Sequence, residues 1–298
     1  MSDLRKGYLL ALATFTLWGL FPFYFRTLES FSALEIIAQR AIWSALFGAL
    51  VLLFWRHPGW WRELAAHPRR FAVLVISGLL VAGNWLIYVW AVNNGHIIEI
   101  SLGYYINPLV NVLLGMLVLR ERLRPLQWAA VLLAAAGVGL QLLMLGQLPW
   151  IALLLAFSFS LYGLLRKMAP VAALPGLVVE TWLLLPVALG WLLLFGSGPS
   201  TEAVFWHGPQ ALWLIAAGPV TIIPLLCFNS AARYLPYSTL GFMQYIAPTL
   251  LLVFAVWVFD EAFPADRQLA FFFIWSGLAI YSYDIWRWLR RGSDKALR

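Results

Sequence analysis

The chain has 298 residues, of which 63% are hydrophobic and only 11% are charged. Soluble globular domains are nearer half apolar and one quarter charged, so this excess of apolar surface excludes an ordinary water-soluble domain. The composition predicts a chain whose surface faces lipid. The formal charge of +7 does not indicate a nucleic-acid-binding protein, because the basic residues lie between apolar runs and at the C-terminus rather than in one patch.

Apolar runs of membrane-spanning length follow one another along the whole chain. About 20 apolar residues cross the hydrocarbon core of a bilayer, and Pro, Gly or charged residues separate successive runs. The first run lacks a convincing small-x-small cleavage site, so we expect it to be retained as a helix. The sequence predicts an all-α polytopic membrane protein with ten transmembrane helices, at 7–26, 34–55, 70–93, 97–119, 125–144, 148–166, 176–195, 210–232, 237–258 and 267–288.

The distribution of Lys and Arg predicts the orientation of these spans, because basic residues collect on the cytoplasmic side of a membrane. With the N-terminus inside, the outer segments contain only Arg26 and Arg267, and Arg40 lies within a span. All other basic residues then fall on the inner side, including Arg166 and Lys167 at the end of the sixth span. We therefore expect both termini to be cytoplasmic.

Two motifs of the first half of the chain return in the second half. The stretch TFTLWGL at Thr14–Leu20 resembles SFSLYGL at Ser158–Leu164. The stretch YINP ending at Pro108 resembles YIAP ending at Pro248, and a glutamate follows each proline thirteen residues later. These pairs predict an internal repeat in which the first span corresponds to the sixth and the fourth span to the ninth.

The repeat predicts two five-helix halves, at residues 1–146 and 147–298. Because five is an odd number, the two halves would cross the membrane in opposite directions. Inverted repeats of this kind are typical of secondary transporters, whose solute site lies near the membrane midplane between the halves. Pro108 and Pro248 are expected to bend the fourth and ninth spans at equivalent depths.

Polar side chains within the spans predict a central cavity. Such groups are costly in hydrocarbon and usually face a cavity or a partner helix. A mixture of apolar walls and a few polar groups suits an organic solute that has both apolar and hydrogen-bonding parts. The expected cavity-lining residues are Trp18, Arg40, Trp85, Tyr88, Asn93, Tyr104, Asn107, Gln244 and Tyr245.

Arg40 is the charged member of this set. It lies five residues after Glu35 in the second predicted span, roughly 7.5 Å deeper at 1.5 Å per residue. Because arginine keeps its charge, it needs an anion, carbonyl oxygens or water nearby. Two interpretations stay open, a structural pair with a carboxylate and a contact with an anionic group of the solute.

Three glutamates within the predicted spans are candidates for coupling transport to protons. No Walker-type nucleotide-binding motif is present, so uphill movement would require an ion gradient. Glu35, Glu99 and Glu180 can titrate, and burial of a carboxyl group favours its neutral form. The alternative is that each only stabilises the first turn of a helix, and Ser32 with Glu35 fits a capping box.

The sequence contains little that indicates catalysis or a metal site. His96 and Glu99 share one helical face, but a closed metal site needs about four ligands, so we expect no metal and no cofactor. The alternative function is a membrane-embedded enzyme that acts on a lipid or a peptide. Neither HExxH nor GxSxG is present. We therefore expect no enzymatic activity and no nucleic-acid partner, and leave the oligomeric state open.

Several longer stretches carry a family resemblance over nearly the whole chain. They are NW at Asn84–Trp85, WAVN at Trp90–Asn93, SLGYYINP at Ser101–Pro108, LPW at Leu148–Trp150, LYGLLRK at Leu161–Lys167, STLGFMQYIAP at Ser238–Pro248 and FFIW at Phe272–Trp275. The chain thereby resembles the drug/metabolite transporter superfamily in its EamA-type form, and more specifically the RarD permeases.

This resemblance implies a multi-pass permease of the bacterial inner membrane, of a kind linked to chloramphenicol sensitivity, and it implies no particular substrate. Arg40 matches the arginine that the superfamily often carries in its second span. We therefore expect a secondary transporter that exports or admits a small organic solute or drug by alternating access. Its expected partners are the solute, the lipid bilayer and, as candidate coupling ions, protons.

Overall fold

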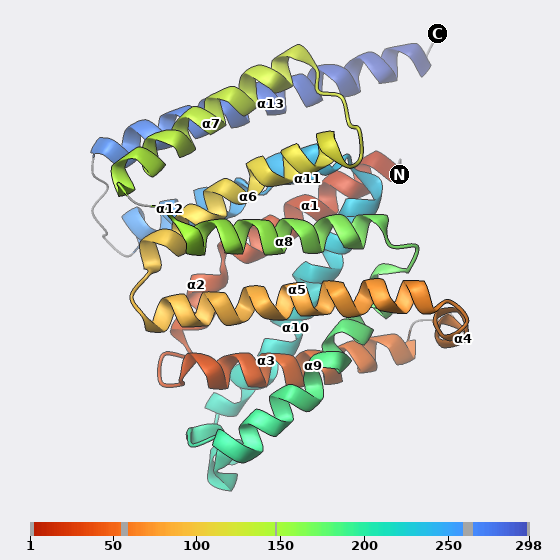
Figure 1. Cartoon of the computed structure of the whole chain (residues 1–298), viewed down its shortest axis with the longest axis vertical. Coiled ribbons are helices and arrows are strands. Elements are labelled where there is room, and N and C mark those ends of the chain that lie inside the picture. Colours follow the sequence, from red (N-terminus) through yellow and green to blue (C-terminus); the bar gives the residue numbers. More distant parts are fainter. Residues whose placement is uncertain (1–2, 55–58, 147, 259–264, 297–298) are drawn as a thin grey trace.

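The computed structural model describes residues 3–54, 59–146, 148–258 and 265–296, and no strand occurs within them (Figure 1). The expected boundary residue Gln147 and the repeated glutamate Glu261 lie outside the described residues. The helices are α1 (Asp3–Gly19), α2 (Phe21–Arg26), α3 (Ala33–Phe54), α4 (Trp60–Ala65), α5 (Pro68–Asn93), α6 (Ile97–Leu117), α7 (Pro125–Leu145), α8 (Trp150–Met168), α9 (Ala173–Phe195), the 3-10 helices η1 (Pro199–Thr201) and η2 (Ala203–His207), α10 (Gln210–Tyr234), α11 (Tyr237–Met243), α12 (Ile246–Trp257) and α13 (Ala265–Ala296).

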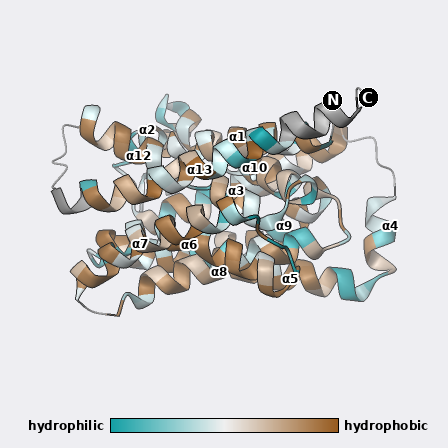
Figure 2. Cartoon of the chain, turned by 90° about the horizontal axis from the view of Figure 1, so that it is seen from above, coloured by the Kyte–Doolittle hydropathy of each residue, from teal (hydrophilic) through white to brown (hydrophobic). Residues whose placement is uncertain are grey.

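Ten helical segments of the described chain are long and apolar enough to cross a membrane, which confirms the predicted fold class. The pair α1 and α2 forms one segment, and the pair α11 and α12 forms another. Hydrophobic residues cover most of the helical surface, and hydrophilic residues gather near the helix ends and on α4 (Figure 2). Leu53, Leu143 and Leu193 are at least 80% exposed, as expected for side chains in contact with lipid.

Two of the ten spans are broken, a feature that apolar length alone does not predict. The first span stops at Gly19 and resumes as α2, with Pro22 in the first turn of α2. The ninth span divides at Gln244, four residues before Pro248. Proline lacks the N–H that bonds to the carbonyl four residues earlier, and its ring clashes with that carbonyl. Because α6 runs uninterrupted through Pro108, the two repeated prolines differ in their effect.

The spans run between two ends of the bundle. Both termini lie at one end, together with α4, and α2 and α12 lie toward the other end (Figure 1). We call the first the terminal end and the second the distal end. An even number of crossings brings the termini to the same side, so this arrangement agrees with the count of ten spans.

Contacts between helices repeat from one half to the other. The helix α1 packs on α10 and on α12, and its counterpart α8 packs on α5 and on α6. The helix α3 packs on α10, and its counterpart α9 packs on α5. The pairs α3 with α9, α6 with α11 and α7 with α13 join counterparts directly. The contact pattern is therefore unchanged when the halves are exchanged, as a two-fold inverted repeat requires.

The contact between α7 and α13 depends on glycines of both helices. A Cβ atom on Gly137 of α7 would lie 2.6 Å from the carbonyl oxygen of Ala270, and one on Gly277 of α13 would lie 2.7 Å from that of Ala130. Small residues let membrane helices approach closely and gain van der Waals contact. The two glycines therefore set the distance between the fifth and tenth spans.

Candidate functional site

A cavity of about 360 Å³ lies between the two halves of the bundle, within the size range of small-molecule sites. Eight helices contribute to its wall. The lining residues are Trp18, Phe21, Pro22, Phe25, Arg40, Asn84, Trp85, Tyr88, Gly103, Tyr104, Asn107, Leu155, Phe159, Thr221, Leu225, Gln244, Ala247, Pro248 and Leu251.

The cavity lies in the distal half of the bundle. Phe25 in α2 and Leu251 in α12 line it, and both belong to the distal parts of broken spans. Tyr88 also lines it, five residues before the distal end of α5. No lining residue comes from the first ten residues of α1, which begin at the terminal end. The cavity is thus displaced from the middle of the bundle toward the distal end.

The structure brings most of the predicted cavity residues together. Those that line the cavity are Trp18, Arg40, Trp85, Tyr88, Tyr104, Asn107 and Gln244. Asn93 does not, because it lies exposed in the last turn of α5. Tyr245 does not either, because it is fully buried at the junction of α11 and α12 and donates a hydrogen bond of 3.1 Å to the carbonyl oxygen of Tyr105. These two side chains therefore lie outside the wall of this cavity.

Among the described residues, Arg40 is the only charged side chain that lines the cavity. Its Nε donates a hydrogen bond of 3.2 Å to Oγ1 of Thr221. Its guanidinium carbon lies 4.7 Å from the ring centroid of Trp85 and 5.6 Å from that of Phe25. No carboxylate in the described part of the chain forms an ion pair with it. Of the two interpretations left open for Arg40, the structural pair with a carboxylate is therefore not found within the described residues.

The amide side chains of the cavity are held from behind by other helices. Asn84 donates two hydrogen bonds of 2.9 Å, to the carbonyl oxygen of Leu155 and to Oγ of Ser158. Gln244 accepts one of 2.8 Å at Oε1 from Asn111. These contacts fix the orientation of each amide and leave its remaining polar atom available toward the cavity.

The wall also contains residues that the sequence did not single out as lining residues. Phe21 and Phe25 come from α2, and Thr221 comes from α10. Thr221 is a polar residue between Pro219 and Pro224 in an apolar run, and that pattern was an available signal. Phe21 and Phe25 gave no such signal, because aromatic residues near the end of a span are also typical of the membrane interface.

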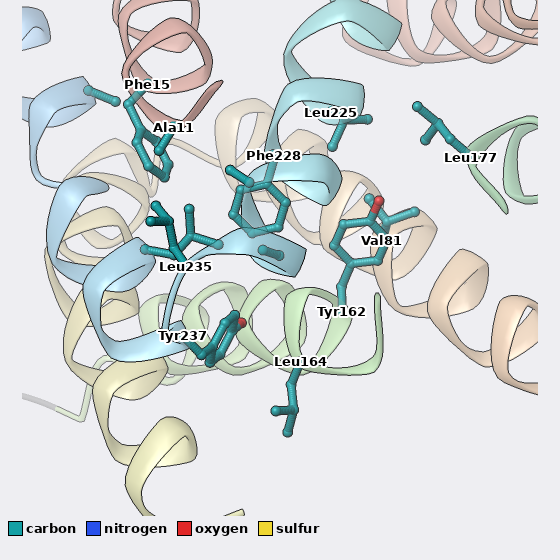
Figure 3. Packing of buried hydrophobic residues seen from close by; sticks show 14 of the residues in the cluster. Ala11, Phe15, Val81, Tyr162, Leu164, Leu177, Leu225, Phe228, Leu235 and Tyr237 are labelled. Carbon is teal, nitrogen blue, oxygen red and sulfur yellow. The ribbon is translucent and has the colours of Figure 1, made fainter. Parts of the chain in front are cut away.

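Buried hydrophobic residues pack together on the terminal side of the cavity (Figure 3), and they include Ala11, Phe15, Val81, Tyr162, Leu164, Leu177, Phe228, Leu235 and Tyr237. On α1, Trp18 lines the cavity whereas Phe15, one turn closer to the terminal end, is fully buried. On α10, Leu225 lines the cavity and Phe228 is fully buried. On α8, Phe159 lines it and the next turn is buried as well. We call this cluster the floor, since it separates the cavity from the terminal end on three helices.

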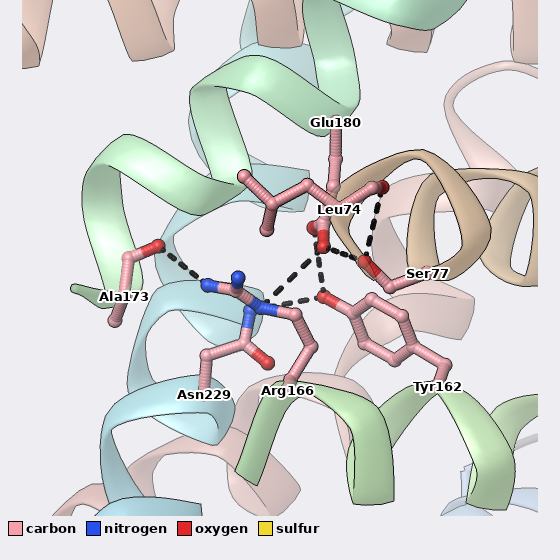
Figure 4. A network of polar contacts seen from close by, with 7 residues as sticks. All are labelled: Leu74, Ser77, Tyr162, Arg166, Ala173, Glu180 and Asn229. Carbon is pink, nitrogen blue, oxygen red and sulfur yellow. Dashed lines mark hydrogen bonds and ion pairs between the residues drawn. The ribbon is translucent and has the colours of Figure 1, made fainter. Parts of the chain in front are cut away.

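A polar network lies in the floor (Figure 4). The carboxylate of Glu180 accepts hydrogen bonds from Oγ of Ser77 at 2.5 Å and from the hydroxyl of Tyr162 at 3.4 Å. Nε of Arg166 lies 3.4 Å from Oε1 of Glu180. Asn229 donates a bond of 2.9 Å to the hydroxyl of Tyr162. The network therefore joins α5, α8, α9 and α10.

The structure adds one finding about this region and corrects one interpretation. Arg166 lies buried in the last turn of α8, which continues to Met168. Glu180 lies seven residues after the start of α9, because that helix begins at Ala173, so it does not stabilise a first turn. The sequence does not indicate the ion pair between Arg166 and Glu180, because the two residues are fourteen positions apart on different helices and belong to no common motif.

The other two candidate glutamates hold helix and loop starts near the distal end. The backbone N–H of Glu35 donates to Oγ of Ser32 at 3.2 Å, and its carboxylate accepts bonds from the backbone N–H of Ser200, at 2.9 Å, and from the Ser200 hydroxyl. Glu99 contacts Nδ1 of His96 at 3.0 Å and accepts a bond of 3.3 Å from the N–H of Ile151. Neither glutamate lines the cavity.

The chain is similar to one protein family, to several individual proteins and to a solved structure. Residues 5–143 match the EamA-like transporter family. An uncharacterized transporter of Pseudomonas aeruginosa is 65% identical to this chain over 290 residues, with 97% of each chain covered. Protein RarD of Escherichia coli is 48% identical over 282 residues, with 94% of this chain and 95% of its own covered. A solved protein structure with 20% identity has a TM-score of 0.69 over 95% of this chain and 98% of its own, a likeness that shows the fold alone.

Proposed function

The chain belongs to the EamA-like transporter family, and from this premise we propose that it is a secondary transporter of a small organic solute across the bacterial inner membrane. The observation that carries the proposal is a cavity between two inverted halves that is closed toward one end of the bundle. A solute site that communicates with one side at a time is what alternating access requires.

The solute would bind in the cavity. The side chains proposed to contact it are Trp18, Arg40, Trp85, Tyr88, Tyr104, Asn107 and Gln244. Their aromatic rings provide apolar walls, and the amides, hydroxyls and guanidinium provide the few placed polar groups that orient a ligand. Because both halves contribute, a rocking movement of one half against the other would change access to the site without dismantling it.

We place the terminal end in the cytoplasm. That end carries most of the basic residues, among them Arg62, Arg70, Arg122 and Arg233, and basic residues favour the cytoplasmic side. The cavity is then nearer the periplasmic side, and the floor is the cytoplasmic seal. Release of a solute to the cytoplasm, or its loading from there, requires the floor to separate.

Glu180 is the best-supported of the three proton-coupling candidates. Glu35 and Glu99 hold backbone N–H groups of other segments, which is a sufficient structural role. Glu180 instead pairs with Arg166 inside the floor, where four helices meet. A proton on Glu180 would remove its charge and weaken its attraction for Arg166, so protonation would favour separation of the floor. The residue that binds the proton would then also control the separation of the floor.

Efflux from proteoliposomes tests the proposal. The vesicles are loaded with a defined mixture of small amino acids, aromatic acids, nucleosides and amines, and the solutes that leave are identified by mass spectrometry. At least one solute should leave faster than from protein-free vesicles, and Trp85→Ala should slow that loss. Trp128→Ala is the matched control, because Trp128 is 44% exposed and does not line the cavity. Equal loss of every solute from all vesicles would contradict transport.

The alternative of a membrane-embedded enzyme makes a different prediction for the same vesicles. An enzyme that acts on lipid would change the composition of the bilayer without moving solutes. Analysis of the vesicle lipids before and after incubation therefore separates the two functions in one experiment.

A further inference from the structure

We infer that the solute is an organic anion, with one carboxylate-like group bound at Arg40 and an aromatic or otherwise flat apolar body. The inference rests on the proposed function in one respect, namely that the cavity is the solute site. Any compound that carries an anionic oxygen group next to a ring system would meet this description.

The first argument is the state of Arg40. Its one hydrogen-bond partner within the described residues is the neutral hydroxyl of Thr221, and the guanidinium lies against the rings of Trp85 and Phe25. An arginine keeps its charge, and a charge at this depth is stable only beside a counter-ion or water. The guanidinium is planar and matches the two oxygens of a carboxylate or a phosphate. An anionic solute group would complete this site.

The second argument is the charge balance of the cavity wall. Within the part of the chain that the structure describes, Arg40 is the one charged lining residue, and no Asp or Glu lines the cavity. An organic cation bound there would face an uncompensated like charge in a poorly screened environment. A neutral solute would leave the guanidinium without a counter-ion. Of the three charge classes, only an anion gains a direct ion pair.

The third argument is the set of hydrogen-bond donors. The phenols of Tyr88 and Tyr104 lie within electrostatic range of the guanidinium and line the cavity. Gln244 uses Oε1 to accept from Asn111, so its amide nitrogen remains as a donor. A carboxylate only accepts hydrogen bonds. A carboxylate can therefore accept from these donors as well as from the guanidinium. An ammonium group would meet neutral acceptors such as the hydroxyls and Oδ1 of Asn84, but it would also face the like charge of Arg40.

The rest of the cavity is suited to a ring. Trp18 and Phe159 lie edge to face, with centroids 5.5 Å apart, and both line the cavity beside Phe21. Aromatic faces bind flat apolar groups through dispersion and edge-to-face contacts. The volume of about 360 Å³ is near the lower end of small-molecule sites, which favours a compact acid of one or two rings.

Three compounds that share one ring system test the charge requirement. They are indole-3-acetate, indole-3-acetamide and tryptamine, which are negative, neutral and positive at pH 7. Thermal unfolding of the purified protein is followed with each compound, since a bound ligand raises the apparent Tm. The variants are Arg40→Gln, Arg40→Lys and the matched control Arg69→Gln, in which the lost charge is exposed and far from the cavity wall.

We expect indole-3-acetate alone to raise the Tm of the unaltered protein and of Arg69→Gln. Loss of a hydrogen-bonded charge pair weakens binding about 10- to 100-fold, so Arg40→Gln should lose the shift, and Arg40→Lys should keep part of it. Equal stabilisation by the neutral or the positive compound would overturn the inference, as would an undiminished shift in Arg40→Gln. No shift with indole-3-acetate, benzoate or 4-hydroxyphenylacetate would also overturn it. If Arg40→Gln does not fold, the charge series on the unaltered protein and Arg40→Lys still decides.

Proteoliposome efflux of the same compounds separates this inference from the proposed function. Binding of the anion without its movement would contradict transport of that anion and leave the charge inference standing. Movement of neutral or positive solutes without any binding of anions would support transport and overturn the charge inference.

Discussion

Arg166 and Glu180 form an ion pair inside the floor, with Nε and Oε1 3.4 Å apart and each side chain 1% exposed. The pair joins α8, which contributes to the cavity wall, to α9, which does not. Arg166 also donates a hydrogen bond of 3.0 Å to the carbonyl oxygen of Ala173 at the start of α9. The start of α9 is therefore attached to the end of α8 by charge as well as by packing.

Removal of one member of this pair should cost more stability than removal of both. A buried charge that loses its partner is destabilising by about 3–5 kcal/mol, whereas replacement of both charges by apolar groups is often nearly neutral. We expect Arg166→Met and Glu180→Leu to lower the free energy of unfolding strongly and the double variant to lower it by less than their sum. Denaturant titration in detergent measures all four proteins. Additive losses would show that the two charges do not interact.

The response of transport to pH distinguishes Glu180 from the other two glutamates. If protonation of Glu180 loosens the floor, Glu180→Gln should abolish uptake driven by a pH gradient while leaving exchange of the solute in place. Glu35→Gln and Glu99→Gln are the matched variants, and they should retain pH-driven uptake at reduced stability, because a neutral amide oxygen is a weaker acceptor for the backbone N–H groups than a carboxylate. Solute flux with and without an imposed gradient is the measurement. Retained pH-driven uptake in all three variants would mean that none of these carboxyls carries the proton.

The contact between the fifth and tenth spans should depend on Gly137 and not on Gly139. A Cβ atom on Gly137 would lie 2.6 Å from a backbone oxygen, whereas one on Gly139 meets nothing within 4 Å. We expect Gly137→Ala to destabilise the protein by about 1–3 kcal/mol, as overpacking does. Gly139→Ala should be neutral or slightly stabilising, because alanine favours a helix over glycine. Thermal unfolding of both variants is the comparison, and equal Tm values would contradict the close approach of α7 and α13.

Much of the fold could be predicted because only a few backbone structures are stable in lipid. Every backbone polar group in hydrocarbon must be satisfied within the chain, so long apolar runs become helices and their count follows from the sequence. The repeat at Thr14–Leu20 and Ser158–Leu164 then predicted the inverted halves. Arg40 and Asn107 could be assigned to the cavity for a related reason, because a polar group within a membrane span is costly unless it faces a cavity or a partner helix.

The errors arose where a long-range contact decides the position of a side chain. Tyr104 and Tyr245 are similar amphipathic residues, yet Tyr104 lines the cavity and Tyr245 is buried against α6. The position on the helix decides this difference and the break at Gln244 does not, because Tyr105, the counterpart of Tyr245 on the uninterrupted α6, is likewise buried. In the sequence, Arg166 next to Lys167 looks like part of a basic segment at the end of a span. The structure shows that Arg166 is buried and forms an ion pair with Glu180 of α9.

Labelling of single cysteines tests the orientation and the floor together. The native Cys227 is first replaced by Ser, and Tyr104→Cys, Phe15→Cys or Leu53→Cys is then introduced. Tyr104 lines the cavity, Phe15 is fully buried in the floor, and Leu53 is 82% exposed on the helical surface that we assign to lipid. A charged, membrane-impermeant thiol reagent needs water and a thiolate, so we expect it to label Tyr104→Cys alone when it is added to right-side-out vesicles.

The same three variants are also labelled in inside-out vesicles. With the terminal end in the cytoplasm and the floor closed, the reagent should reach Tyr104→Cys slowly or not at all from that side, and Phe15→Cys should react only when the floor separates. Addition of a transported solute should protect Tyr104→Cys from the periplasmic side, because the solute occupies the same space. Labelling of Tyr104→Cys only in inside-out vesicles would reverse the proposed orientation. Rapid labelling of Phe15→Cys from the periplasmic side would mean that the packed cluster does not seal the cavity, and alternating access would then need a different barrier.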